Sequence, residues 1–351
     1  MHPFTIATGT MDYAQNILIK VFTSENIIGV GECSAFPMIV GETQNTCYEM
    51  AKDFAALWKG KDALNIEERL TELHLFTAGN STIKSAFDMA LYDIAAKYAN
   101  QPLYEFLGGT KKQMLTDITV GIGMPEIMAA QAKAFVEKGA TILKIKLGKD
   151  VATDVERIKQ IRERIGNKIK IRIDANQGWT FEDAKNALTQ LGKYNIEFCE
   201  QPIRTYNDEY LPELMKLSPI KIMADESVYN HHDALRLIKN NACDYINIKF
   251  AKSGGIHEAL KIIAVSKENN IPCMMGGMLE SRVALTAFAH FAAANPQIIF
   301  YDMDTCMLGH KVDPVIGGVT YNGYNVQLPS GNGIGASVEE RFLEGCEMIV
   351  V

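Results

Sequence analysis

The sequence lacks the features that mark membrane, secreted and nucleic-acid-binding proteins. No apolar run approaches the ~20 residues that a membrane span requires. The first residues, MHPFTIATGT, have neither the basic region nor the apolar region of a signal peptide. The net charge is −7, and no run of Lys and Arg is interleaved with aromatic residues, which argues against a nucleic-acid groove. We therefore expect a cytoplasmic protein that binds neither membranes nor nucleic acids.

Paired cysteines are also missing. The seven cysteines are scattered without a C-x-x-C pair, and several lie inside apolar strand patterns. We expect buried free thiols in a reducing compartment rather than disulfides or a zinc site. Histidine is absent from the ends of the predicted strands. His231 and His232 begin one predicted helix and His257 begins another, so capping or solvated positions are expected for them and a histidine base is disfavoured.

The 351 residues are 47% hydrophobic and 22% charged, which is typical of an ordinary globular protein. This length suffices for two domains or for one barrel with additions. Residues 3–35 alternate as in antiparallel strands, with a turn at Ser24–Asn26. Strands followed by helices predict a small α+β domain over residues 1–114. Helical spacing is found in three segments of this domain: 46–58, 66–76 and 80–108.

From Thr116 onward, strand patterns and helical patterns alternate. Eight strands over residues 115–315 fit a closed β/α barrel better than an open sheet. An open doubly wound sheet would need a Gly-rich phosphate loop after its first strand, and GIGMPE is a poor match. The last segment, 316–351, contains an Asn322-Gly323 hairpin turn. This hairpin is too small to stand alone, so we expect the segment to pack back on the N-terminal domain.

Five consecutive β-α units each end their strand with an ionisable residue. These residues follow one another at spacings of 28, 26, 25 and 24 positions: Lys146, Asp174, Glu200, Asp225 and Lys249. In a parallel barrel the C-terminal ends of the strands converge on one mouth. Three carboxylates there would repel one another unless a cation lay between them, and oxygen ligands without His or Cys suit Mg²⁺. For any single carboxylate, a salt bridge or a helix N-cap is the structural alternative.

Lys144 and Lys146 lie two positions apart on one strand, so both side chains face the lumen. Two ammonium groups this close are expected to lower each other's pKa, which makes a lysine a usable base. Lys249 lies on the opposite wall of the predicted barrel. One lysine would suffice for elimination or decarboxylation, whereas lysines on opposite walls suggest removal of a proton from one face of a carbon and its return to the other. A carboxylate partner is the structural alternative for a single barrel lysine.

Asp302 and Asp304 end the eighth strand with the same two-residue spacing, so both carboxylates point the same way. We expect them to lie far along the barrel from the metal ligands and to bind an ammonium group of the substrate. An Arg or Lys partner within the fold is the alternative. Glu280 and Ser281, just past the seventh strand, are expected to help hold Lys249 or to cap the next helix.

Taken together, these motifs resemble the enolase superfamily, in its muconate-lactonizing-enzyme branch. The matching motifs are K-I-K, I-D-A-N, C-E-Q-P, A-D-E-S and N-I-K-F-A-K-S-G-G, with ALYDIAAK and LYEFLGG in the N-terminal part. The similarity runs from Pro3 to about Gly335 and implies a (β/α)₇β barrel under an α+β cap. It also implies the ligands and bases of the site: Mg²⁺ on Asp174, Glu200 and Asp225, a substrate carboxylate on that Mg²⁺, and acid/base lysines at Lys146 and Lys249.

The resemblance further implies a substrate and a reaction. Branch members include cycloisomerases, o-succinylbenzoate synthases, N-acylamino acid racemases and dipeptide epimerases. Asp302-x-Asp304 resembles the epimerases' D-x-D, which binds the α-ammonium of a dipeptide, and Thr119 occupies a position that lines the site. We expect an isomerase that inverts the C-terminal residue of an Ala-X dipeptide through an enediolate, with Lys144 assisting Lys146. Another reaction of the branch and a non-catalytic barrel that binds a cationic metabolite are the alternatives.

Two features depart from the pattern of the epimerases. In the L-Ala-D/L-Glu epimerases an Arg in the first cap loop meets the glutamate side chain, whereas the matching position here is Gly9. This leaves room for Ala-Ala or another neutral dipeptide. The chain also starts at or just before this loop, so we expect the first cap strand to be absent or shortened. The cap loops, 8–12 and 37–42, are expected to close over the substrate and set specificity. We also expect a homo-oligomer.

Overall fold

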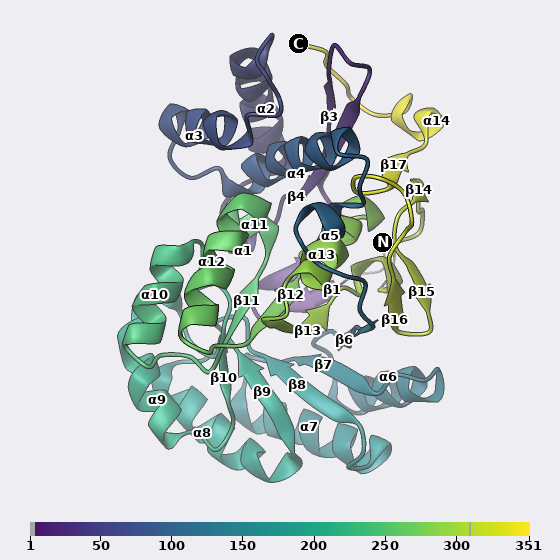
Figure 1. Ribbon diagram of the computed structural model, residues 1–351. Coiled ribbons are helices and arrows are strands. Elements are labelled where there is room, and N and C mark those ends of the chain that lie inside the picture. The colour runs from purple at the N-terminus through teal and green to yellow at the C-terminus, as the bar shows by residue number, and fades with distance from the viewer. Residues whose placement is uncertain (1–3, 309) are drawn as a thin grey trace.

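A parallel barrel forms the larger part of the molecule (Figure 1). The computed structural model describes residues 4–308 and 310–351. The strand order follows the sequence, from β6 to β13, and the N–H of Asp117 donates to the carbonyl of Tyr301 at 3.2 Å, which joins the last strand to the first. The predicted barrel fold is confirmed. Its strands are β6 (Ile118–Val120), β7 (Ile142–Lys146), β8 (Lys170–Asp174), β9 (Ile196–Glu200), β10 (Ile222–Ala224), β11 (Tyr245–Ile248), β12 (Cys273–Gly276) and β13 (Ile298–Asp302).

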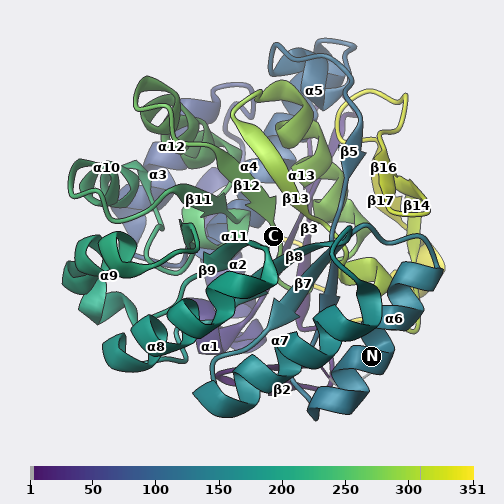
Figure 2. The same cartoon turned by 90° about the horizontal axis from the view of Figure 1, so that it is seen from below.

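Helices follow the strands and surround them, as the view from below shows (Figure 2). Within the described residues, no helix has the length and apolar character to cross a membrane. His231 begins α10 and His257 lies in the first turn of α12, as predicted. The helices of the barrel are α6 (Pro125–Glu137), α7 (Val151–Ile165), α8 (Phe181–Leu191), α9 (Leu211–Leu217), α10 (His231–Lys239), α11 (Phe250–Ser253), α12 (Ile256–Glu268) and α13 (Arg282–Ala294), with 3₁₀ turns η1 (Gly192–Tyr194), η2 (Thr205–Tyr210) and η3 (Thr305–Met307).

Local sequence signals fix the turns that follow the strand ends. The side chain of Asp150 accepts a hydrogen bond from the N–H of Thr153 at 2.8 Å and caps α7. Thr180 caps α8 in the same way through the N–H of Asp183 at 3.2 Å. Such caps satisfy N–H groups that a helix leaves without intrahelical partners. These caps thereby fix the loops that follow β7 and β8, next to the last residue of each strand at the barrel mouth.

The cap lies over one end of the barrel (Figure 1). Its central helix, α4, packs against the β3–β4 hairpin on one side and against α11 and α12 on the other, so every residue from Thr82 to Ala96 is buried. The predicted hairpin is confirmed, and residues 1–3 of the predicted cap lie outside the described residues. The elements of the cap are β1 (Phe4–Ile6), β2 (Gly9–Met11), β3 (Asn16–Phe22), β4 (Ile28–Ser34), α1 (Pro37–Val40), α2 (Gln44–Trp58), α3 (Ile66–Phe76), α4 (Ser81–Tyr98) and α5 (Leu103–Phe106).

The C-terminal segment runs along the cap and the barrel edge (Figure 1). Strand β16 pairs with β5 (Met114–Leu115), and the carbonyl of Gly333 accepts from the N–H of Leu103 at 2.8 Å. The predicted turn at Asn322-Gly323 joins β15 to β16. We propose that the chain divides near residues 114 and 315, as the sequence predicts. The elements of this segment are β14 (Val315–Gly317), β15 (Thr320–Asn322), β16 (Asn325–Gln327), β17 (Ala336–Val338) and α14 (Glu340–Leu343).

Loops of the cap contact the loops that follow the barrel strands. The carbonyl of Thr5 accepts from the N–H of Ile122, just past β6, at 2.9 Å. The hydroxyl of Tyr229, past β10, donates to the carbonyl of Ile39 in α1 at 2.8 Å. The side chain of Asn16 donates to the carbonyl of Leu279, past β12, at 3.1 Å. Residues 4–40 therefore cover the C-terminal ends of the strands, where the sequence predicts the site.

Candidate active site

The structure brings the five predicted strand-end residues to one mouth. Lys146, Asp174 and Glu200 are the last residues of β7, β8 and β9, and Asp225 and Lys249 directly follow β10 and β11. Three strands separate β7 from β11 in an eight-stranded order, so the two lysines come from opposite walls. All five side chains are buried. The wall between the two lysines carries the three carboxylates.

Each of the two facing lysines is paired with a different carboxylate. Lys146 Nζ lies 2.6 Å from Asp174 Oδ2, and Lys249 Nζ lies 2.8 Å from Asp225 Oδ2. Glu200 lies between them in the strand order, with Oε1 3.9 Å from Lys249 Nζ. Lys146 and Lys249 thus lie at opposite ends of the row of three carboxylates. A group placed at their centre would lie between the ammonium groups of Lys146 and Lys249.

All three carboxylates are buried, but their pKa values are shifted in different directions. Burial raises the pKa of Asp174, but the ammonium groups of Lys146 and Lys144 outweigh it and the net pKa is lowered. Burial and the nearby charge of Asp174 raise the pKa of Glu200 to about 7. For Asp225, burial is outweighed by two lysines, and the pKa is well below its usual range. Glu200 is repelled by the negative charges of Asp174 and Asp225, and a cation bound between the three would offset this repulsion.

The donor set fits Mg²⁺. Glu200 Oε2 and Asp225 Oδ1 are buried and accept no hydrogen bond among the described residues, although each has a lysine ion-pair partner, at 2.8 and 2.6 Å. Carboxylate oxygens with free lone pairs and no His or Cys are the ligands that Mg²⁺ prefers. Asp174, Glu200 and Asp225 are the residues that would hold the ion.

Lys144 is surrounded by carboxylates rather than by other ammonium groups. Its Nζ lies 2.8 Å from Glu200 Oε2, 3.2 Å from Asp174 Oδ2 and 2.8 Å from Asp302 Oδ2. Burial alone would lower the pKa of Lys144, but these carboxylates raise it well above its ordinary value. The expectation that Lys144 and Lys146 lower each other's pKa is therefore wrong for Lys144, because three negative partners outweigh one positive neighbour.

The position expected for Asp302 also needs correction. It does not lie far from the metal ligands, because Lys144 bridges it directly to Asp174 and Glu200. The lysine partner that the sequence left open as the structural alternative is present. Asp304 accepts from the backbone N–H of Thr119 at 2.6 Å, and burial and the charge of Asp302 raise its pKa to about 7.

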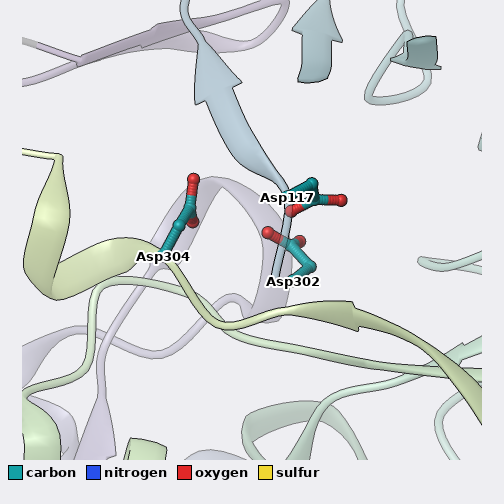
Figure 3. A group of neighbouring side chains, drawn as sticks. All are labelled: Asp117, Asp302 and Asp304. Atoms are coloured by element: carbon teal, nitrogen blue, oxygen red, sulfur yellow. The ribbon is translucent and has the colours of Figure 1, made fainter. Parts of the chain in front are cut away.

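Asp117 joins Asp302 and Asp304 in a buried carboxylate cluster that the sequence analysis missed (Figure 3). One oxygen from each lies within 4.8 Å of the others, and Asp117 is also paired with Arg172 at 2.8 Å. Asp117 precedes Thr119 by two positions, so the alternation that places Thr119 in the lumen also places Asp117 there. This two-residue spacing could have identified Asp117 as a residue that faces the lumen. Asp302 and Asp304, at the end of β13, form the anionic part of the mouth beyond Lys144, whereas Asp117 precedes β6 and extends the cluster deeper into the barrel, toward Arg172.

Glu280 and Ser281 have separate roles in the structure. Ser281 caps α13, since its hydroxyl accepts from the N–H of Val283 at 3.2 Å. Glu280 accepts from the N–H of Met278 at 2.6 Å, and burial raises its pKa to about 8. Within residues 4–308 and 310–351, no hydrogen bond or ion pair joins Glu280 to Lys249. The capping alternative thus applies to Ser281.

Two further polar residues at the mouth were missed. Asn247 donates to Glu200 at 2.8 Å, and it precedes Lys249 by two positions on β11. Lys252 lies 2.6 Å from Asp225 Oδ1 and also donates to the carbonyls of Val228 and Asn247 at 3.1 Å. The alternation along β11 could have indicated Asn247. Nothing in the spacing distinguishes Lys252 from a surface lysine, because it lies in the short helix α11 beyond the strand.

The cysteines are free thiols, as predicted. All seven lie within the described residues and are free, and five of them are buried. The buried thiols lie in the cap core or in the barrel wall rather than among the charged residues of the mouth. Burial raises the pKa of Cys199, Cys243 and Cys273 above the ordinary range of a thiol. The ionisable groups of the mouth are therefore carboxylates and lysines.

Comparison with known proteins agrees with this arrangement. Residues 127–342 match the family described as "Enolase C-terminal domain-like", and residues 1–108 match "Mandelate racemase / muconate lactonizing enzyme, N-terminal domain". The chain belongs to the enolase superfamily. It is similar to the D-Ala-D/L-Ala epimerase of Cytophaga hutchinsonii, with 42% identity over 351 residues that cover 99% of this chain and 95% of that protein. It is also 41% identical, over 318 residues and 90% of each chain, to the hydrophobic dipeptide epimerase of Enterococcus faecalis.

Solved structures of this enolase superfamily branch give the same result. The dipeptide epimerase of Cytophaga hutchinsonii, complexed with Mg and the dipeptide D-Ala-L-Val, has a TM-score of 0.97 and 42% identity, with 99% of this chain and 94% of that chain covered. The Enterococcus faecalis dipeptide epimerase, complexed with Mg and L-Leu-L-Tyr, has a TM-score of 0.92 and 40% identity, with 95% of each chain covered. The chain is an isomerase of the racemase and epimerase group, as predicted, and the predicted cofactor is the metal found in both solved relatives.

Proposed function

We propose that the protein is an Mg²⁺-dependent dipeptide epimerase that inverts the α-carbon of the C-terminal residue by transfer of one proton between two lysines. One observation carries the proposal: Lys146 and Lys249 reach the three carboxylates from opposite walls, at 2.6 and 2.8 Å from their partners. A carbon held between them is exposed to a base on one face and to an acid on the other. Inversion requires this arrangement, whereas elimination requires only one base.

The carboxylates and the lysines have different roles in the proposed reaction: the carboxylates would hold the metal ion, and the lysines transfer the proton. Asp174, Glu200 and Asp225 would hold Mg²⁺, which would supply positive charge to offset the negative charge that develops on the substrate when its α-proton leaves. Lys146 or Lys249 takes the α-proton, and the other lysine returns a proton to the opposite face. The direction depends on which epimer is bound.

The anionic cluster beyond Lys144 suits the other end of a dipeptide. Asp302 and Asp304 are buried, and a free α-ammonium group would be paired there with carboxylates of opposite charge. Lys144 holds Asp302 next to the metal ligands, and the N–H of Thr119 holds Asp304. The substrate would therefore lie between a cation for its carboxylate and carboxylates for its ammonium group. The similarity to relatives named as dipeptide epimerases supports this proposal.

The test is incorporation of deuterium at the α-carbon in D₂O. With Mg²⁺ present, L-Ala-L-Val is expected to epimerise and to carry deuterium at the inverted carbon. Lys146→Ala and Lys249→Ala are each expected to slow epimerisation by roughly 10²–10⁴-fold, because each removes one proton carrier. Lys20→Ala, in the cap hairpin, is the matched control and is expected to keep wild-type rates. Full exchange from both epimers in both lysine variants would contradict the two-base mechanism.

A further inference from the structure

Arg172 lies in an apolar layer of the barrel interior, below the carboxylates of the mouth. It precedes Asp174 by two positions on β8, so its side chain faces the lumen, and it is 3% exposed. Its guanidinium carbon lies 5.3 Å from the centre of the Phe198 ring and 5.0 Å from the centre of the Phe300 ring. Aromatic faces attract a cation, and a guanidinium group is weakly hydrated, so it tolerates this position. Arg172 therefore places a permanent positive charge below the mouth.

Two carboxylates orient the guanidinium group of Arg172. Its Nη1 lies 2.8 Å from Asp117 Oδ2, and its Nε lies 2.7 Å from Glu197 Oε2. Glu197 is partly exposed and is also paired with Lys170 at 3.1 Å, whereas Asp117 is fully buried. The planar guanidinium group presents donors in a fixed fork, so it can bond both carboxylates at once. Glu197 therefore orients the group, and Asp117 is the buried partner of its charge.

The carboxylate cluster of Asp117, Asp302 and Asp304 has more negative charges than cationic partners (Figure 3). Arg172 is paired with Asp117, and Lys144 is paired with Asp302 at 2.8 Å. Over residues 4–308 and 310–351, no lysine or arginine forms an ion pair with Asp304. Asp117 Oδ1 is buried and accepts no hydrogen bond from any residue that the structure describes. Within this part of the chain, at most two cations therefore serve three buried carboxylates, because Lys144 is also shared with the metal ligands.

A buried carboxylate that has no cationic partner binds a proton more readily than an exposed one. Burial and the charge of Asp302 raise the pKa of Asp304 to about 7, and the same two effects raise the pKa of Asp117 well above its usual range. The titratable groups near Asp304 on η3 and in the C-terminal segment are uncharged at neutral pH, since burial raises the pKa of each: Cys306, Tyr321 and Tyr324. The proton that offsets the excess negative charge therefore belongs to the carboxylate cluster as a whole.

We infer that the pairing of Arg172 with Asp117 leaves the carboxylate cluster with one unbalanced negative charge, which a proton balances in the free enzyme and the α-ammonium group of the substrate balances in the complex. The inference rests on the proposed function and adds Arg172 and Asp117 to it as positioning residues. Arg172 acts through Asp117, which lies deeper in the barrel than Asp302 and Asp304. As the ammonium group enters, one carboxylic O–H bond breaks and its proton passes to the solvent.

The first measurement counts the protons released when the Mg²⁺-loaded enzyme binds L-Ala-Gly, whose C-terminal residue has no configuration to invert. Titration calorimetry at pH 6.5 in two buffers of different ionisation enthalpy gives this number. A cluster whose pKa is about 7 holds roughly three-quarters of a proton at this pH, and the dipeptide carries its ammonium group. N-acetyl-L-Ala-Gly has the same carboxylate but no ammonium group, so we expect L-Ala-Gly to release roughly three-quarters of a proton more. Equal proton release for the two dipeptides would overturn the inference.

The second measurement changes the charge of the carboxylate cluster. Asp117→Asn removes one carboxylate while Arg172 stays charged, so the remaining negative charges are balanced without a proton. We expect this variant to bind L-Ala-Gly roughly 30-fold more weakly than wild type and to lose the extra proton release. Adding Arg172→Met removes the matching cation, so the double variant is expected to regain most of the affinity and the proton release. A merely structural role of the pair would instead make the double variant at least as poor as Asp117→Asn.

Asp53→Asn and Arg164→Met, both at exposed positions, are the matched controls, and their double variant is expected to keep the wild-type affinity and proton release. Thermal unfolding of each variant shows whether it is folded, and the proton count of the wild type decides alone if the variants are not. A double variant that binds L-Ala-Gly no better than Asp117→Asn would overturn the role of Arg172. Failure of the wild type to bind L-Ala-Gly would overturn the inference, whereas absence of deuterium exchange from L-Ala-L-Val would overturn the proposed function.

Discussion

Lys144 contacts more carboxylates than either lysine that we propose as a proton carrier. It touches Glu200, Asp174 and Asp302, which come from three different strands. Its charge is therefore fixed, and it is better suited to hold carboxylates in place than to exchange protons. The two-residue spacing from Lys146 predicts that both side chains face the lumen, but it does not reveal which carboxylates each will meet.

Replacement of Asp302 tests the ammonium end of the site. Asp302→Asn removes one negative partner from the proposed substrate ammonium and from Lys144. We expect kcat/KM for L-Ala-L-Val to fall about 100-fold, which corresponds to about 3 kcal/mol, as when one partner of a buried charge pair is removed. The N-acetylated dipeptide has no ammonium group, so the variant should no longer discriminate against it. Asp62→Asn, exposed in the cap, is the control.

A loss for the N-acetylated dipeptide as large as that for the free dipeptide would contradict a role of Asp302 in binding the ammonium group. It would indicate that the variant acts on the metal ligands through Lys144. The two outcomes are separated by the ratio of kcat/KM for the two substrates, measured in the same preparation of each variant.

Helix α13 is joined to the cap and to the C-terminal segment through His290. The backbone N–H of Tyr104 can only donate, so His290 Nδ1 accepts from it at 3.1 Å and Nε2 donates to the carbonyl of Ile334 at 3.0 Å. The neutral imidazole is the form that satisfies both bonds. Burial lowers the pKa of His290 from 6.5 to about 4.

This shift predicts a loss of stability in mild acid. Between pH 6.5 and about 4 the unfolded chain binds a proton at His290 that the folded chain does not, so the contribution is present above pH 6.5 and is lost as the pH falls. It amounts to about 3 kcal/mol. Urea unfolding from pH 7 to pH 4 should show a shallower decline in His290→Gln than in wild type. His232→Gln, at an exposed position of α10, should follow wild type, and parallel curves for all three would contradict the assignment.

Helix α1 is an element that the sequence alone does not predict. The long helices and all eight barrel strands could be predicted, because each repeats a hydrophobic period over enough residues to be recognised. Residues 37–42 were predicted only as a loop, since Pro37–Val40 is one turn long and carries no period. What fixes this turn is the contact between Ile39 and Tyr229, which are 190 residues apart in sequence. The spacing from Thr119 could have placed Asp117 in the lumen but could not reveal its partner Arg172, and Lys252 was missed because its role depends on Asp225, which follows another strand.

At the scale of the whole molecule, Asp93 connects three parts of the chain. Its carboxylate accepts from the N–H of Val30 at 2.9 Å, from the N–H of Ile334 at 2.7 Å and from Lys97 Nζ at 2.6 Å. Asp93 is fully buried. A hairpin of the cap, its central helix and the C-terminal segment thus share one buried acceptor group.

Removal of this group should destabilise the protein far more than removal of a surface ion pair. Asp93→Ala leaves buried donors without an acceptor, and we expect a loss of about 3 kcal/mol in the free energy of unfolding. Glu340→Gln breaks the ion pair with Lys20 on an exposed side chain, and we expect a change of less than about 0.5 kcal/mol. Denaturant unfolding at pH 7 compares the two. Similar losses in both variants would show that Asp93 does not link these parts.

Gly333 and Ile334, which attach the C-terminal segment to Leu103 and Asp93, lie near the end of the chain. These two residues leave the ribosome after every barrel strand has been made. The barrel strands that carry the acidic and basic residues can therefore assemble before the C-terminal segment forms its hydrogen bonds with the cap. The hydrogen bonds between the cap and the C-terminal segment can therefore form only after all the barrel strands have been synthesised.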